Sequence, residues 1–90
     1  MNVSIIGGGY VGLVSAVCFA DLGHFVQCIE HDDEKFNSLN LGKIPFYEPE
    51  LQEKFQKTVD RKTLSIRPKI DPSIFESDII ILAVGTPMTS

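Results

Sequence analysis

The sequence predicts an α/β fold in which helices flank a parallel sheet of about four strands. Short, almost wholly apolar runs at residues 3–6 and 79–84 suit strands that are buried on both faces. Helix-like segments alternate with strand-like runs, which gives parallel strands joined by right-handed crossovers. A glycine-rich turn joins the first strand-like run to the first helix-like segment. Together these features favour the spatial strand order third, second, first, fourth.

The turn after the first strand has the spacing G-x-G-x-x-G, with glycines at positions 7, 9 and 12. Gly7 permits a tight turn, Gly9 lets a pyrophosphate approach the backbone, and Gly12 lets the next helix pack closely on the strand. The start of that helix presents free N–H groups and a partial positive charge. This pattern is typical of Rossmann-like dinucleotide-binding folds. The alternative is a plain βαβ unit whose glycine-rich turn binds nothing.

An acidic residue, Glu30, ends the second expected strand, which covers residues 25–29, and lies 18 positions after Gly12. A carboxylate at this distance is placed to accept hydrogen bonds from the ribose hydroxyls of a dinucleotide. It would repel the 2′-phosphate of NADP, and no arginine follows it closely, so we expect NAD as the cofactor. The alternative is that Glu30 is a solvated residue at the end of a strand.

The first helix, expected at residues 11–22, is apolar almost all round, so we expect burial on more than one side, as in part of a larger fold. The aspartates at the start of the second helix favour its N-terminus. The remaining expected elements are a helix at residues 31–41, a loop at 42–49, a helix from Pro49 with a buried stripe at Leu51, Phe55 and Val59, a strand at 64–67, and a connecting turn at 68–76.

Two further side chains are candidate ligand contacts. The first and fourth strands should flank the point where the strand order reverses, which places Thr86, just after the fourth strand, near the cofactor. The alternative is a threonine in a turn that merely ends the strand. Lys35 lies in the second helix, from which it could reach the cofactor's ribose or phosphate. On composition alone, Lys35 is a solvated lysine.

The composition limits the class of protein. Ninety residues, of which 43% are hydrophobic, suit one small domain, and the formal net charge of −4 argues against nucleic acid or an anionic membrane as a partner. No apolar run approaches the ~20 residues of a membrane span, and the N-terminus lacks a signal-peptide pattern, so we expect a cytoplasmic protein. Cys18 and Cys28 are expected to be small buried hydrophobes, and neither they nor His24 and His31 have the spacing of metal ligands.

Three motifs carry a resemblance to a known family. The segments Gly7-Gly8-Gly9-Tyr10-Val11-Gly12-Leu13, Gly42-Lys43-Ile44-Pro45-Phe46-Tyr47-Glu48-Pro49 and Val84-Gly85-Thr86-Pro87 resemble, in order and spacing, those of the nucleotide-sugar dehydrogenases, with the bacterial UDP-glucose 6-dehydrogenases as the closest group. The resemblance spans essentially the whole chain. It implies oxidation of a sugar nucleotide's primary alcohol to a carboxylate, with two NAD molecules and a cysteine thioester.

The resemblance also implies roles for single residues. Tyr10 and Val11 would contact the NAD pyrophosphate, and Lys35 would lie near the adenosine end. Thr86 would contact NAD from the fourth strand. Glu30 stands where the family usually has aspartate, and Glu50 stands where it usually has glycine. The longer Glu30 side chain is expected to relax the ribose geometry slightly, and Glu50 to change the start of a helix without abolishing cofactor binding.

On this resemblance, residues 1–90 are the N-terminal part of an NAD-binding domain. The family's catalytic cysteine, lysine and asparagine are expected outside these residues, and neither cysteine of this chain matches the nucleophile. We therefore expect a chain that is not catalytic alone and meets a nucleotide sugar only in a full-length enzyme. Alternatives are a stand-alone module for NAD or adenine nucleotides, a truncated fragment that self-associates, and, less well matched, a flavin-binding domain. A homo-oligomer is expected because the first helix and the fourth strand are strongly apolar.

Overall fold

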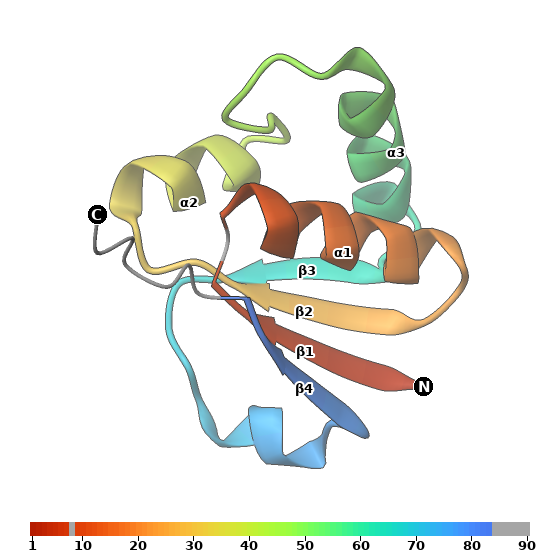
Figure 1. The fold of residues 1–90 in the computed structure, drawn as a ribbon, viewed down its shortest axis with the longest axis vertical. Coiled ribbons are helices and arrows are strands. Elements are labelled where there is room, and N and C mark those ends of the chain that lie inside the picture. Colours follow the sequence, from red (N-terminus) through yellow and green to blue (C-terminus); the bar gives the residue numbers. More distant parts are fainter. Residues whose placement is uncertain (8, 84–90) are drawn as a thin grey trace, which may run out of the picture.

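The computed structural model of the chain describes residues 1–7 and 9–83 and contains one parallel sheet. Its strands are β1 (Asn2–Ile6), β2 (Phe25–Ile29), β3 (Leu64–Arg67) and β4 (Ile79–Leu82), in the order β3-β2-β1-β4 (Figure 1). All three neighbouring pairs are parallel. The predicted class and strand order are confirmed.

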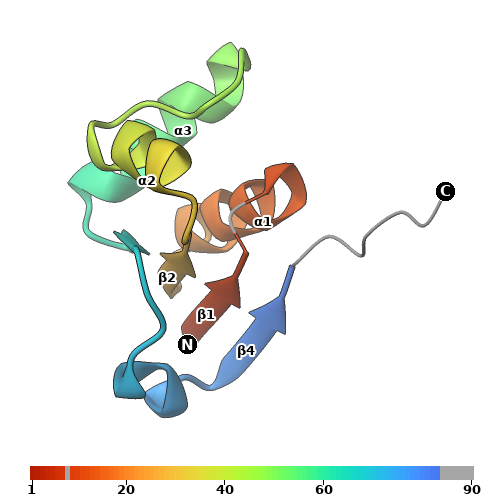
Figure 2. The ribbon, with the colours of Figure 1, turned by 90° about the vertical axis from the view of Figure 1, so that its left-hand side faces the viewer.

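The two faces of the sheet are covered differently. The helices α1 (Tyr10–Asp21), α2 (Asp33–Asn40) and α3 (Pro49–Asp60) lie on one side, and the 3₁₀ helix η1 (Pro72–Glu76) lies on the other (Figure 2). This arrangement follows from the right-handed crossovers: the β1–β2 and β2–β3 connections cross one face, and the β3–β4 connection crosses the opposite face.

Local chemistry sets the helix ends. Gly23 follows α1 with a φ of 102°, a left-handed conformation that glycine adopts without strain. The Asp32 carboxylate caps α2, because its Oδ1 accepts hydrogen bonds from the N–H groups of Glu34 (3.0 Å) and Lys35 (3.3 Å). This helix therefore begins at Asp33 and not at residue 31. Pro49 begins α3, where its missing N–H costs no helical hydrogen bond.

The core lies between the sheet and the three helices. Along β1 and β2, Val3 pairs with Val26 and Ile5 with Cys28, and these four side chains face α1. Phe55 is fully buried, as its apolar stripe predicts, whereas Val59 is half-buried and the neighbouring Thr58 takes a buried place. The main cluster comprises Val3, Ile5, Leu13, Ala16, Val17, Ala20, Val26, Cys28, Leu39, Ile44, Leu51, Phe55 and Leu64.

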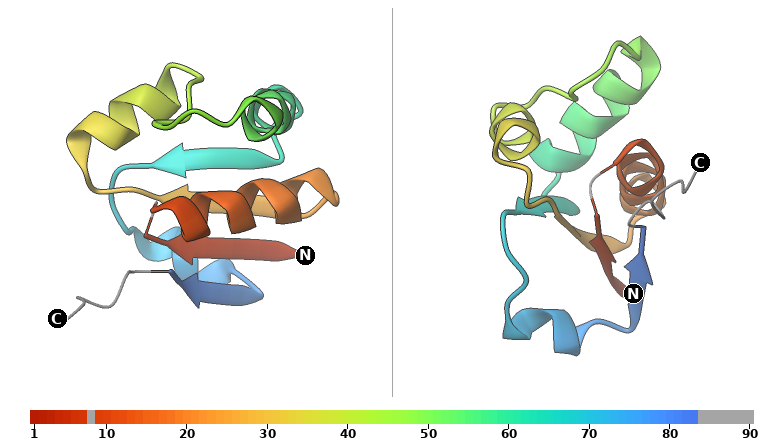
Figure 3. Two further views of the ribbon diagram at one scale, coloured as in Figure 1. Left: turned by 45° about the horizontal axis from the view of Figure 1, so that its top comes forward. Right: turned by 60° about the vertical axis from the view of Figure 1, so that its left-hand side comes forward.

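Helix α1 packs on the sheet and against α3, which supplies a second neighbour for this apolar helix (Figure 3). An ion pair between Asp21 and Lys57, with 4.0 Å between Oδ1 and Nζ, joins the two helices. The outward side of α1 is nevertheless open, because Val11 and Cys18 are exposed. The prediction that Cys18 is buried is wrong: its helical position faces away from both neighbours.

Strand β4 departs most from expectation. We expected burial on both faces, but Ile79, Ile80 and Leu82 are 41%, 42% and 69% exposed. This strand pairs with β1 along one edge and is the last strand of the described sheet, so few atoms cover its faces. Val84, expected to end the strand, lies outside the described residues.

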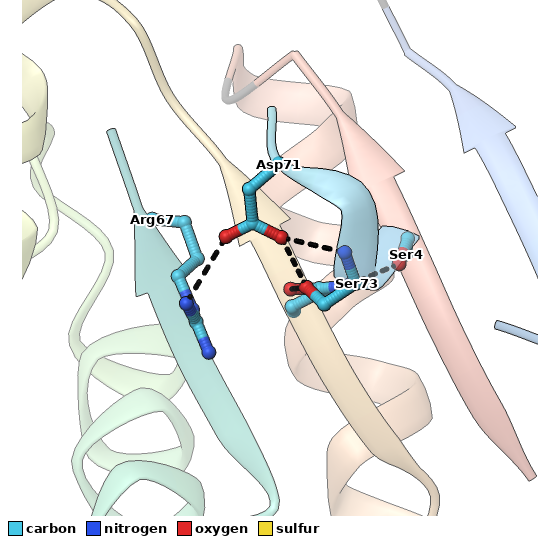
Figure 4. Close-up of polar contacts among 5 residues, drawn as sticks. Ser4, Arg67, Asp71 and Ser73 are labelled. Atoms are coloured by element: carbon cyan, nitrogen blue, oxygen red, sulfur yellow. Dashed lines mark hydrogen bonds and ion pairs between the residues drawn. The ribbon is translucent and has the colours of Figure 1, made fainter. Parts of the chain in front are cut away.

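The face under η1 is polar at its centre (Figure 4). Ser4 of β1 is fully buried, and its hydroxyl accepts a hydrogen bond from Gln27 Nε2 (2.8 Å) and contacts the Ser77 hydroxyl. The Asp71 carboxylate accepts hydrogen bonds from the Ser73 hydroxyl and N–H, and it pairs with Arg67 at 3.4 Å. These interactions, the Ser73 hydrogen bonds first, lower the pKa of Asp71 below its ordinary value. The network fixes the β3–β4 connection on the sheet.

Candidate nucleotide site at the glycine-rich turn

The turn after β1 is built by close backbone contact. Gly7 has a φ of 103°, and its N–H donates a hydrogen bond to the Ile29 carbonyl of β2 (3.0 Å). Gly12 lies in the first turn of α1 and is buried; a Cβ added there would meet the Gly7 carbonyl oxygen at 2.1 Å. Both glycines are therefore required by the geometry: Gly7 by its conformation, and Gly12 by the approach of the helix to the strand.

The N-terminus of α1 is open. Gly9 is its N-cap residue and has no side chain to accept the first N–H groups, and no acidic residue lies in the first turn. Among residues 1–7 and 9–83, a Cβ added to Gly9 would meet nothing within 4 Å, so these residues leave space beside this backbone. Tyr10 and Val11 follow as the first two helical residues, and both side chains are exposed. An anion can therefore reach unsatisfied N–H groups here, in the manner of a dinucleotide pyrophosphate.

Glu30 follows β2 and is only 4% exposed. Its N–H donates to the Arg67 carbonyl (2.8 Å), and its Oε1 accepts a hydrogen bond from the Asp32 N–H (3.2 Å). The alternative of a solvated strand-end residue is therefore wrong. Burial, and secondarily the negative charge of Glu30, raise the pKa of Cys28 to about 12, so this thiol stays protonated and unreactive.

The structure brings the glycine turn and Glu30 to one edge of the sheet. Ile6 pairs with Ile29, so the carboxyl ends of β1 and β2 lie side by side. Glu30, the residue after β2, therefore lies beside Gly7, the first residue of the glycine turn. Lys35 lies in the first turn of α2, close after Glu30 in the chain, with an exposed side chain. Thr86, the remaining predicted contact, lies outside the described residues.

One aromatic contact was not foreseen from the sequence. The rings of Tyr10 and Phe46 lie 4.8 Å apart between centroids, tilted by 44°. The two residues are 36 positions apart, and no spacing rule connects a loop after α2 with the first turn of α1. The second unforeseen contact is the Asp32 N–H, which orients the Glu30 carboxylate.

The described residues also form a cavity away from this edge. A cavity of about 250 Å³ lies between the sheet and η1, but none of the sequence-predicted site residues lines it. Across residues 1–7 and 9–83, no group of three potential metal ligands gathers. In the same described part of the chain, no helix has the length and apolarity needed to cross a membrane.

Comparison with known proteins identifies the family. The sequence profile described as "UDP-glucose/GDP-mannose dehydrogenase family, NAD binding domain" matches residues 1–90, the whole chain. The chain belongs to this family.

Bacterial members of the family are similar in sequence to the chain. The UDP-glucose 6-dehydrogenase TuaD of Bacillus subtilis is 47% identical over 88 residues, which are 98% of this chain and 19% of that protein. The UDP-glucose 6-dehydrogenase of Rhizobium meliloti is 42% identical over 87 residues, 97% of this chain and 20% of that protein. The chain thus spans about one fifth of the length of these relatives.

Solved structures of the family share the fold. A ternary complex of GDP-mannose dehydrogenase from Pseudomonas aeruginosa matches with a TM-score of 0.88 and 36% identity, over 97% of this chain and 20% of that one. UDP-glucose dehydrogenase from Pyrobaculum islandicum matches with a TM-score of 0.86 and 35% identity, over 96% and 20% of the two chains. The glycine turn and Glu30 therefore lie in the part of the family's fold that is its NAD-binding domain.

Proposed function

We propose that residues 1–90 form the adenosine and pyrophosphate half of the NAD site of a nucleotide-sugar dehydrogenase. One observation carries the proposal: the uncapped N-terminus of α1, beside which the described residues leave space at Gly9, lies next to the buried carboxylate Glu30. The space beside Gly9 is the feature that a pyrophosphate needs, and Glu30 provides the acceptor that ribose hydroxyls need. The proposed contacts are Gly7, Gly9, Tyr10, Val11, Gly12, Glu30, Lys35 and Thr86.

In a longer enzyme, the reaction we propose is oxidation of UDP-glucose to UDP-glucuronate, for which bound NAD supplies the hydride acceptor. The relatives named UDP-glucose 6-dehydrogenase support this substrate. The residues of this chain would bind and orient the cofactor: N–H groups of Tyr10 and Val11 toward the pyrophosphate, and Glu30 toward the ribose. Catalytic side chains would come from outside residues 1–90, so this chain alone would bind without catalysis.

The test is a calorimetric titration of the folded chain with NAD, NADP and UDP-glucose. We expect heat with NAD only, because Glu30 repels a 2′-phosphate and no sugar-nucleotide contact is proposed here. Glu30→Ala should weaken NAD binding about tenfold or more, the effect of losing hydrogen bonds to a charged acceptor. Glu34→Ala, which removes an exposed carboxylate from the first turn of α2, is the matched control and should change little. A folded chain without affinity for NAD would contradict the proposal.

A second candidate function is self-association through β4, and the exposed apolar side chains of this edge strand favour it. The outer edge of β4 has no partner strand among the described residues, and its exposed Ile79, Ile80 and Leu82 invite pairing with another copy. Sedimentation velocity should then show a dimer or larger oligomer at high concentration, and Leu82→Lys should shift the chain toward monomer. Leu41→Lys replaces another exposed leucine, the C-cap residue of α2, and should leave the distribution unchanged. A wild-type chain that is monomeric throughout would contradict self-association and would favour a stand-alone nucleotide-binding module.

A further inference from the structure

The loop between α2 and α3, residues 41–48, is held from two helices (Figure 1). On the α2 side, the Ser38 hydroxyl donates to the Lys43 carbonyl (2.9 Å), and the Lys43 N–H donates to the Ser38 carbonyl (3.0 Å). On the α3 side, Gln52 donates from Nε2 to the Gly42 carbonyl and accepts at Oε1 from the Ile44 N–H, both at 2.8 Å. The Gln52 side-chain amide thus makes one donor and one acceptor hydrogen bond to the loop backbone, the pattern that a neighbouring β-strand provides.

The loop conformation has little freedom. Gly42 has a φ of 90°, and a Cβ added there would meet Gln56 Oε1 at 2.9 Å. Ile44 is buried and belongs to the main core cluster. Phe46 is half-buried and packs against the same cluster. The loop therefore presents the Phe46 ring from a fixed backbone.

The ring of Phe46 meets Tyr10, the first residue of α1. The later residues of this first turn, Gly12 and Leu13, are buried. Its first residue is less restrained among the described residues, because the N-cap is Gly9, which has no capping side chain, and glycine leaves the backbone unusually free. Tyr10 itself is 59% exposed. Among the described residues, the tilted aromatic contact with Phe46 is thus a side-chain contact that ties the first residue of α1 to the α2–α3 loop.

We propose that Phe46 is a positioning residue of the pyrophosphate site, acting through Tyr10. The inference rests on the proposed NAD-binding function and adds a residue outside the glycine turn. By holding the Tyr10 ring, Phe46 fixes the first turn of α1 before the ligand arrives, so that less conformational freedom is lost on binding. The α2–α3 loop, anchored by Gln52, is the support that makes this restraint rigid.

A double-mutant cycle tests the coupling. We expect Phe46→Ala to weaken NAD binding about 2- to 10-fold, the range of an aromatic pair, and Phe46→Tyr to leave the affinity within about twofold. In a Tyr10→Ala background, Phe46→Ala should cause no further loss. Tyr47→Ala, at the neighbouring and 93% exposed position of the same loop, is the control and should leave the affinity unchanged. An equal loss in both backgrounds, or no loss while the wild type binds NAD, would overturn the inference.

A measurement without ligand separates this inference from the proposed function. Backbone ¹⁵N relaxation should show lower order parameters at Tyr10 and Val11 in Phe46→Ala, but not in Tyr47→Ala. Phe46→Leu keeps an apolar side chain without the ring, and it should give the same local change with thermal stability close to wild type. Failure of the wild type to bind NAD would contradict the proposed function. Unchanged relaxation at Tyr10 in Phe46→Ala would contradict the inference about Phe46, whether or not NAD binds.

Discussion

Strands β1 and β4 are neighbours in one sheet, but the more apolar of the two is the less buried. In β1, which includes Asn2 and Ser4, the residues from Val3 to Ile5 are all buried. In β4, whose sequence is Ile-Ile-Ile-Leu, three of the four side chains are at least 41% exposed. The two strands pair with each other residue by residue, but β1 also pairs with β2 along its other edge, whereas β4 is the last strand of the described sheet.

The difference comes from the layers above and below each strand. Helix α1 covers β1 and β2 on one face, and on the other face Ser4 is enclosed by Gln27 and Ser77. Strand β4 lies at the edge of the described sheet, where neither α1 on one face nor the polar contacts on the other face cover most of it. An apolar sequence therefore shows that a strand is suited to burial, whereas position in the sheet decides whether burial is achieved among the described residues.

The largest expected effect on stability comes from an isoleucine-to-alanine substitution, made once in β1 and once in β4. Ile5→Ala should lower the free energy of unfolding by about 2–5 kcal/mol, because it leaves a cavity in a fully buried site. Ile80→Ala, in the paired strand, should cost less than about 1 kcal/mol, because its side chain is 42% exposed. Urea unfolding followed by circular dichroism measures both. Similar losses of unfolding free energy at Ile5 and Ile80 would contradict the conclusion that β1 and β4 differ in burial.

An intermediate effect is expected at the glycine turn. Gly12→Ala should cost about 1–3 kcal/mol or more, because the new Cβ would lie 2.1 Å from the Gly7 carbonyl and 3.1 Å from the Ala83 Cβ, just after β4. This result would show that the start of α1 is held tightly against the turn after β1. The Cβ of Gly9→Ala would meet none of the described residues within 4 Å, so this variant should change stability by less than about 1 kcal/mol.

The two glycine variants separate folding from binding. Because the space beside Gly9 is where we propose that the pyrophosphate lies, Gly9→Ala should remove NAD binding from a chain that still unfolds cooperatively. Thermal unfolding with and without NAD measures both properties. Retained NAD affinity in Gly9→Ala would argue against that placement, and a stable Gly12→Ala would argue against the close contact of helix and strand.

The smallest expected effect concerns the buried thiol of β2. The pKa of Cys28 is raised from 9.0 to about 12 in the folded chain, so between these values only the unfolded chain releases the proton. Stability is therefore lost as the pH rises past 9, by about 1 kcal/mol between pH 8 and pH 10. Urea titrations at the two pH values should show this loss in wild type and in Cys18→Ala, and a smaller loss in Cys28→Ala. Identical pH dependence in all three would contradict it.

The sequence predicted those features that depend on short spacings. The glycine turn, the strand order and Glu30 at the end of β2 follow from local patterns and from the handedness of crossovers, and the structure has each of them. The burial of Glu30 was not predictable, because it depends on the packing around β2 and on the Asp32 N–H.

Apart from the start of α2, which the local Asp32 cap decides, the failures concern neighbours distant in sequence. Cys18 is exposed because α1 has a side that neither the sheet nor α3 covers, and no periodicity in so apolar a helix marks that side. The Tyr10–Phe46 contact joins two elements whose approach is decided by the course of the α2–α3 loop. Aromatic residues in a loop carry no signal of the partner that they will meet.

The Gln52 amide has a consequence for protein engineering. Because one side chain on α3 holds the backbone at Gly42 and Ile44, and Pro45 fixes its own φ, the shape of the loop depends little on the exposed residue Tyr47. This position is a display site: its side chain can be exchanged on an unchanged backbone one residue from Phe46. A library randomised at position 47, with Gln52, Pro45 and Phe46 retained, would vary the rim of the proposed nucleotide site while conserving its frame.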